Sequence, residues 1–143
     1  MKYTEFLVNG QAPWWWHWKN FTPQEVACKK DGKVCPHCGG EIWGTQFGTI
    51  PLIWFFESMD ALQALRNAYG KPLVINSGHR CKTHNKEVGG VANSKHLTNI
   101  AFDCRVPFEE QEHFAKLAHD AGFHYVLTYP DRGFVHCDIW TRH

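Results

Sequence analysis

Two segments of this 143-residue chain carry the side chains that most restrict how it can fold. The first, residues 94–103, places His96 and Asp103 on either side of a turn that leads into an apolar, strand-like stretch. The second, residues 133–138, contains His136 in another strand-like run. Two neutral imidazoles and one carboxylate are the ligand set of a zinc ion that keeps one position for water. If the three side chains converge, the fold must bring these two strands together.

The two-residue alternation of a β-strand indicates which neighbours face such a site. Asp103 lies on the opposite face of its strand from Cys104, and His136 and Asp138 share a face that Cys137 does not. We therefore expect Cys104 and Cys137 to pack away from the site as small apolar residues. Taken alone, each polar residue also has a structural explanation, because a single histidine is more often a core or surface residue than a ligand.

Helix and strand patterns mix along the chain without strict alternation. The sequence predicts a short helix starting at Thr22-Pro23, helices over 58–70 and 109–121, strands over 72–75, 100–106, 125–129 and 134–140, and loops over 28–49 and 81–93. Thr22 and Glu25 have the spacing of a capping box, and Gly70 and Gly122 follow the two long helices. This order predicts an α+β domain, residues 1–143, with a mainly antiparallel sheet and flanking helices.

An aromatic segment opens the chain at residues 1–22, with four tryptophans among residues 14–18. Buried rings contribute strongly to small cores, so we expect these rings to cover apolar surface of the core. The alternative is a platform of rings for a sugar or peptide ligand.

Charge and hydropathy exclude several classes of protein. The net charge is +1, so no strong field favours nucleic acid or an anionic membrane. The apolar run at residues 50–56 is far shorter than the roughly 18 residues that a membrane span needs. No secretory signal is visible at the N-terminus, so we expect a protein made in the cytoplasm, without a disulfide framework. We also expect a monomer.

A cysteine cluster follows the aromatic segment. Cys35 and Cys38 form a Cys-x-x-Cys pair followed by two glycines, and Cys28 precedes them, which is typical of half a structural zinc site. The candidates for a further ligand are His17, His37 and Cys81. The alternatives are free thiols or one disulfide. A nucleic-acid module of the zinc-ribbon type is disfavoured by the near-neutral charge.

Five motifs resemble, in the same order, those of the zinc D-Ala-D-Ala carboxypeptidase family of peptidases. They are residues 77–85, 88–90, 93–96, 101–103 and 129–138. That family includes phage endolysins, murein endopeptidases and vancomycin-resistance dipeptidases, and the hedgehog signalling domain has a distantly related zinc fold. The resemblance covers about residues 21–140 and implies a peptidase acting on peptidoglycan stem peptides, as a carboxypeptidase or a murein endopeptidase, in phage lysis or in a virion.

The resemblance also implies roles for individual residues. His96, Asp103 and His136 would be the zinc ligands, and Arg80 would reach the peptide or carboxylate group of the substrate. A guanidinium can hold a carboxylate through two parallel hydrogen bonds, so this role is chemically sensible for Arg80. Ser77 and His79 lie beside this arginine and are candidates for lining the pocket.

Two positions depart from the pattern of that family. Asn99 stands where a glycine is usual, and Gly133 stands where many members carry an acid that acts as general base. We expect Asp131 to act as the base, Asp138 to orient a ligand imidazole, and His124 to be a further candidate for proton transfer. If none serves as base, the protein would be a catalytically impaired zinc domain that binds the cell wall or has a structural role.

Overall fold

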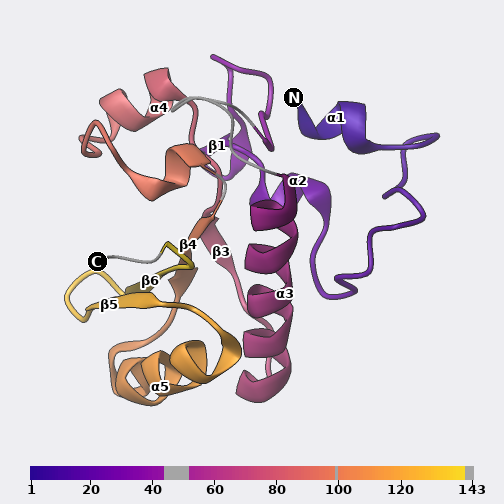
Figure 1. Ribbon diagram of the computed structural model, residues 1–143. Helices are drawn as coiled ribbons and strands as arrows, with labels where there is room; N and C mark the ends of the chain where they lie inside the picture. Colours follow the sequence, from indigo (N-terminus) through magenta and orange to yellow (C-terminus); the bar gives the residue numbers. More distant parts are fainter. Residues whose placement is uncertain (44–51, 99, 141–143) are drawn as a thin grey trace.

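The structure is a computed structural model that describes residues 1–43, 52–98 and 100–140 (Figure 1). Its elements, in chain order, are α1 (Tyr3–Phe6), α2 (Pro23–Val26), β1 (Lys29–Lys30), β2 (Lys33–Val34), α3 (Leu52–Tyr69), β3 (Ile75–Ser77), α4 (Lys82–Glu87), η1 (Lys95–Thr98), β4 (Ala101–Arg105), η2 (Phe108–Glu110), α5 (Gln111–Ala121), β5 (Tyr125–Tyr129) and β6 (Phe134–Asp138). Within the described ranges, no helix is long and apolar enough to cross a membrane.

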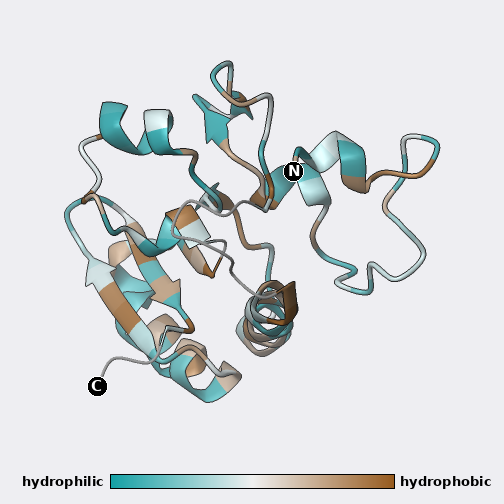
Figure 2. Ribbon diagram, turned by 45° about the horizontal axis from the view of Figure 1, so that its top comes forward, coloured by the Kyte–Doolittle hydropathy of each residue, from teal (hydrophilic) through white to brown (hydrophobic). Residues whose placement is uncertain are grey.

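A four-stranded antiparallel sheet, in the order β3-β4-β6-β5, forms the centre of the fold. One face of this sheet packs on α3 and α5, where Cys104, Val135 and Cys137 join a buried cluster that includes Met59 and Phe114. Figure 2 shows this alternation as brown and teal segments along the strands. The expected α+β class, with a mainly antiparallel sheet and flanking helices, is confirmed. The opposite face of β4 and β6 is left to carry polar side chains.

The local signals for the helix ends are confirmed. The Thr22 hydroxyl accepts the backbone N–H of Glu25 at 3.3 Å, and the Glu25 carboxylate accepts the N–H of Thr22 at 3.0 Å. Gly122 ends α5 with φ of +117°, a conformation that costs glycine little.

Several element predictions were wrong in their bounds or type. Helix α3 begins at Leu52 instead of residue 58, because the apolar run before the periodic stretch continues the helix and buries Phe55. Strand β3 covers Ile75–Ser77 instead of 72–75, since its partner is β4 and the pairing starts only at Ile75. The predicted loop 81–93 contains α4, a six-residue polar helix without the apolar periodicity that would reveal it.

The predicted loop over 28–49 holds a small hairpin, β1–β2, and its residues 44–49 lie outside the described part of the chain. The predicted helix over 109–121 is preceded by a 3₁₀ turn, η2, and the regular helix α5 starts at Gln111. Strands β4 and β6 stop one or two residues short of their predicted ends, which is within the normal uncertainty of element boundaries.

The aromatic N-terminal segment mostly covers the core. Trp18 is fully buried and its indole N–H donates to Asp60 at 2.7 Å, while Trp15 stacks on Phe56 with ring centroids 5.4 Å apart. Trp14 differs, since it is 93% exposed. The structural interpretation is therefore confirmed for the inner tryptophans, and the ring platform for a ligand finds no support from them.

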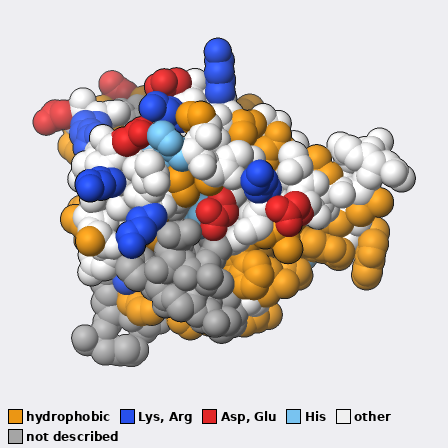
Figure 3. Space-filling view, turned by 90° about the horizontal axis from the view of Figure 1, so that it is seen from above, with side chains coloured by type: hydrophobic (Ala, Val, Ile, Leu, Met, Phe, Trp, Pro, Cys, Tyr) orange, Lys and Arg blue, Asp and Glu red, His pale blue; other side chains and the backbone are white. Residues whose placement is uncertain are grey.

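The face seen from above in Figure 3 has two parts. Lysine, arginine and acidic side chains intermingle on its left, over the side where Figure 1 has α4, and hydrophobic side chains extend to its right, over the N-terminal segment. Interspersed charges of both signs match the net charge of +1.

Candidate metal centre

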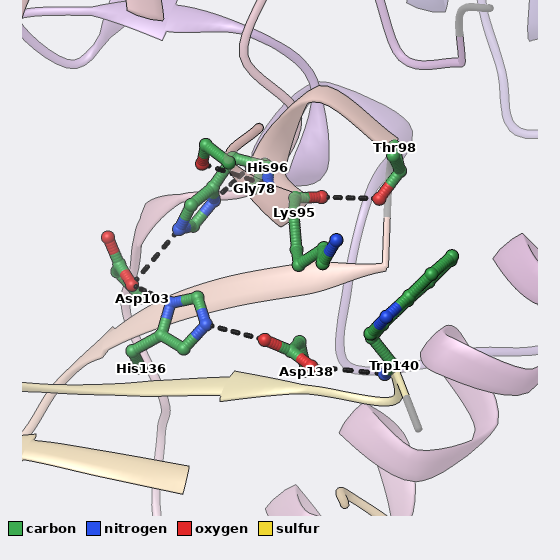
Figure 4. A network of polar contacts seen from close by, with 9 residues as sticks. Gly78, Lys95, His96, Thr98, Asp103, His136, Asp138 and Trp140 are labelled. Atoms are coloured by element: carbon green, nitrogen blue, oxygen red, sulfur yellow. Dashed lines mark hydrogen bonds and ion pairs between the residues drawn. The ribbon is translucent and has the colours of Figure 1, made fainter. Parts of the chain in front are cut away.

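The three predicted ligands meet on the polar face of the sheet (Figure 4). Asp103 on β4 pairs in register with His136 on β6, and His96 reaches them from η1. One ligand atom from each lies within 4.8 Å of the other two. Asp103 Oδ1 is 3.2 Å from His96 Nε2 and 3.0 Å from His136 Nδ1. The antiparallel pairing of β4 with β6 therefore builds the site.

A second contact fixes the orientation of each imidazole. His96 Nδ1 lies 2.7 Å from the carbonyl oxygen of Gly78, to which it donates, and this leaves Nε2 to face Asp103. His136 Nε2 lies 2.8 Å from Asp138 Oδ2, and this leaves His136 Nδ1 to face the carboxylate of Asp103. Such outer contacts set the tautomer and the aim of metal-binding histidines. The contact agrees with the orienting role expected of Asp138, which itself stays a prediction.

The donor atoms fit a zinc ion. With its proton on Nδ1, His96 directs the lone pair of Nε2 at a carboxylate oxygen that also offers only lone pairs. His96 Nε2 is buried and has no hydrogen-bond partner among the described residues. Convergent acceptors of this kind repel one another until a cation lies between them. Two imidazoles and a carboxylate are also a ligand set that zinc accepts.

The electrostatics of the site favour a positive charge. Burial raises the pKa of Asp103, but the nearby His96 and the hydrogen bond from His136 outweigh it and hold this pKa well below its usual range. Burial lowers the pKa of His136, yet its hydrogen bonds with Asp103 and Asp138 raise it to about 9. The metal-free site thus holds a proton on His136 at neutral pH, and a bound metal ion would displace it.

An open cavity of about 1330 Å³ lies over this site, and the three ligand residues, Ser77 and Arg80 are among those that line it. The backbone N–H of Arg80 donates to the carbonyl oxygen of His96 at 2.9 Å, which ties the arginine to the metal site. Burial lowers the pKa of Arg80 and the charge of Asp103 raises it, and a guanidinium stays protonated in proteins. A cation thus stands beside the candidate metal position.

Comparison with known proteins agrees with this geometry. A sequence model of the family described as Peptidase M15 matches residues 19–138 of the chain. The chain belongs to this family. It is also 38% identical over 110 residues to a protein named zinc D-Ala-D-Ala carboxypeptidase from Streptomyces albus G. That match covers 76% of this chain and only 40% of the relative, so the chain spans less than half of the protein it matches. The family is one of zinc metallopeptidases.

The predicted proton acceptors are not brought to the candidate metal site. Asp131 is exposed in the turn between β5 and β6 and is not among the residues that line the cavity. His124 lines a different pocket, of about 460 Å³, together with Trp54 and Asp60. Gly133 has φ of +72°, which disfavours the acid that the family resemblance implies at this position. Asn99, the other departure, lies outside the described residues. The base therefore stays a prediction.

Two features of the site were missed by sequence reasoning. The carbonyl of Gly78 orients His96, and no side-chain pattern signals a backbone acceptor. Tyr125 lines the cavity beside His136, with ring centroids 6.0 Å apart. Its position opposite Asp138 on the neighbouring strand was a usable signal, because the alternation of β5 follows from that of β6. His79, expected near the pocket, is buried and does not line the cavity.

The backbone packs closely behind the site at Gly78. A Cβ atom at this position would lie 2.5 Å from the carbonyl oxygen of Val26, which accepts the N–H of His79 at 3.0 Å. We expect Gly78→Ala to lower the free energy of unfolding by about 1–3 kcal/mol and to weaken zinc binding. Urea denaturation and zinc titration would measure both, and wild-type values for this variant would contradict the close packing.

Asp138→Asn isolates the orienting contact. Asp138 Oδ2 accepts a hydrogen bond from His136, and Asp138 Oδ1 accepts the backbone N–H of Trp140 at 3.0 Å. An asparagine has a single acceptor oxygen, so it cannot serve both donors. We expect about 10- to 100-fold weaker zinc binding at the His96 site. A competitive titration with a chromogenic chelator measures this affinity, and Asp120→Asn, at an exposed position of α5, is the control. Equal affinities in both variants would refute the orienting role of Asp138.

Proposed function

We propose that this protein is a zinc-dependent peptidase that cleaves peptidoglycan stem peptides. The observation that carries the proposal is the convergence of three potential ligand atoms, from His96, Asp103 and His136, beneath an open cavity that Arg80 also lines. Membership of the peptidase family supplies peptides as the class of substrate. The stem peptide is inferred from the name of the Streptomyces albus G relative, of which this chain spans only a part.

Each residue near the cavity has a defined task in this proposal. His96, Asp103 and His136 would hold the ion, and Asp138 would keep His136 in the tautomer that offers Nδ1. A bound zinc ion would supply an acidified water ligand and polarise the scissile carbonyl.

Substrate binding and proton transfer fall to other residues. The guanidinium of Arg80 would bind the terminal carboxylate of the peptide through two parallel hydrogen bonds, which orients the last peptide bond over the site. Asp131 is the proposed acceptor of the water proton and its donor to the leaving amine. Because this carboxylate is exposed in a turn, it would have to approach the cavity when substrate binds.

Arg80 favours a carboxypeptidase over a murein endopeptidase within this proposal. A half-buried guanidinium beside the metal position suits a substrate that ends in a free carboxylate. Action at the cell wall after synthesis in the cytoplasm belongs to the same proposal, while a link with phage lysis or a virion rests on the sequence resemblance alone.

Metal removal tests the function directly. We expect a chelator to abolish release of D-Ala from a synthetic stem peptide that ends in D-Ala-D-Ala, and added zinc to restore it. Mass spectrometry of the products identifies the bond that is cut. Digestion of purified peptidoglycan in parallel would reveal an endopeptidase instead. Hydrolysis that persists after complete removal of zinc would refute the proposal.

A catalytically impaired zinc domain is the second candidate. It is favoured by Gly133, which carries no acid, and by the position of Asp131 outside the cavity lining. On this alternative the purified protein would bind zinc and sediment with peptidoglycan, yet release no product from either substrate. Turnover of the synthetic stem peptide by the wild type, absent in His136→Ala, would exclude it.

A further inference from the structure

A second group of potential metal ligands lies away from the sheet. Cys28, Cys35, Cys38 and Cys81 each offer a sulfur atom, and these four atoms all lie within 4.8 Å of one another. All four are free thiols; three are buried, and Cys38 is partly exposed. They come from three separate parts of the chain: the end of α2, the segment after the β1–β2 hairpin, and the start of α4. Such convergence of buried thiols calls for a physical explanation.

We propose that these four sulfurs bind a structural zinc ion, separate from the one held by His96, Asp103 and His136. Zinc bound tetrahedrally by thiolates, with Zn–S distances of about 2.3 Å, places its sulfurs about 3.8 Å apart. The sulfurs of Cys35 and Cys81 are 3.9 Å apart, which matches this spacing. Four protein ligands leave no open position for water, so the ion would stabilise the fold and take no part in hydrolysis.

The backbone around the sulfurs is built for thiolates. Three backbone N–H groups donate to them: Glu41 to Cys38 at 3.3 Å, Cys81 to Cys28 at 3.3 Å, and His84 to Cys81 at 3.4 Å. Donors of this kind stabilise the negative charge of coordinating sulfur.

The turn that follows the Cys-x-x-Cys pair is equally specific. The N–H of Gly39 donates to the carbonyl of Cys35 at 2.8 Å, and Gly39 and Gly40 have φ of +71° and +88°. A Cβ on Gly40 would lie 2.6 Å from the ring of Tyr3, so no other residue fits without displacement of that ring. The turn brings both sulfurs to one side, as a zinc knuckle requires.

The fourth ligand is the one that sequence spacing left open. His17 is directed elsewhere, since its Nε2 contacts Asp60 at 3.1 Å, and His37 forms an ion pair with Glu87. Cys81 alone of the three candidates joins the group of four.

The position of Cys81 gives the ion a consequence for the cavity. This residue directly follows Arg80, and the nearby His79 N–H donates to Val26, two residues before Cys28. An ion held by Cys28 and Cys81 would therefore link the end of β3, and with it Arg80, to the residues that follow α2. In Figure 1 the β1–β2 hairpin and α4 lie side by side, where such a cross-link would join them. The inference stands whether or not the protein proves to be a peptidase.

The experiment starts from a variant in which the site of His96, Asp103 and His136 cannot bind zinc. The double variant His96→Ala, His136→Ala lacks two of the three ligands of the first site, and we expect it to purify with one zinc ion per chain. X-ray absorption at the zinc edge should show sulfur neighbours only, at about 2.3 Å. A folded double variant that binds no zinc, or binds it through nitrogen and oxygen, would overturn the proposal.

Two further measurements test the site even if the double variant does not fold. In the intact chain reconstituted with cobalt, four thiolates should give strong thiolate-to-metal charge-transfer absorption in the near ultraviolet. Cys81→Ser should weaken these bands and reduce the zinc content by one ion, whereas Cys104→Ala, a cysteine outside the group, should change neither. Reconstituted wild type without such bands would exclude the site.

Discussion

His136→Ala is expected to lower the kcat/KM for stem-peptide hydrolysis by at least about a thousandfold and to remove one zinc ion per chain. The side chain supplies one of three ligand atoms, since its Nδ1 is 3.0 Å from Asp103 Oδ1. Its loss also leaves the fully buried Asp138 without the imidazole partner of Oδ2. A hydrogen bond to a charged group contributes about 1.5–3 kcal/mol, so its loss should lower the melting temperature as well.

A matched histidine separates this effect from a general one. His113 lies exposed on α5, away from the cavity, and His113→Ala should retain activity, zinc content and melting temperature. Elemental analysis and peptide assays of the two variants decide the matter. If His136→Ala keeps its full zinc content and hydrolyses the stem peptide at the wild-type rate, the metal centre described here is not the active site.

The convergence of His96, Asp103 and His136 was predictable because strands have a strict alternation and a family-like order of motifs accompanied it. The burial of Cys104 and Cys137 followed from the same alternation, and both lie in the core beneath the site. Patterns of this kind repeat with the period of the backbone, so they can be read from the sequence and are found again in the folded structure.

Other parts of the site depend on contacts that no local pattern encodes. The carbonyl of Gly78 orients His96 across 18 positions of sequence, and Cys81 joins sulfurs that lie 43 to 53 positions earlier. Helix α4, which carries Cys81 at its N-terminus, is short and polar, so its existence depends on tertiary contacts and a sulfur cap. Long-range closure of this kind is decided by packing, and only the folded structure displays it.

Arg80→Ala is expected to lower the kcat/KM for a stem peptide with a free terminal carboxylate by about 30- to 1,000-fold. This range corresponds to about 2–4 kcal/mol for the loss of one partner of a desolvated charge pair. The half-buried guanidinium belongs to a residue that lines the cavity, so a ligand in the cavity can reach it. Arg80→Lys should recover only part of the loss, because an ammonium cannot form two parallel hydrogen bonds.

The substrate itself supplies the sharpest control for Arg80. A stem peptide with an amidated C-terminus lacks the carboxylate, so wild type and Arg80→Ala should cleave it at similar, low rates. Arg132 also lines the cavity but packs over Phe134, 5.2 Å from the ring centroid, and Arg132→Ala should change neither rate by more than a fewfold. Equal losses on both substrates in Arg80→Ala would mean that this arginine contacts the peptide backbone. The argument for a carboxypeptidase would then fail and that for an endopeptidase would gain.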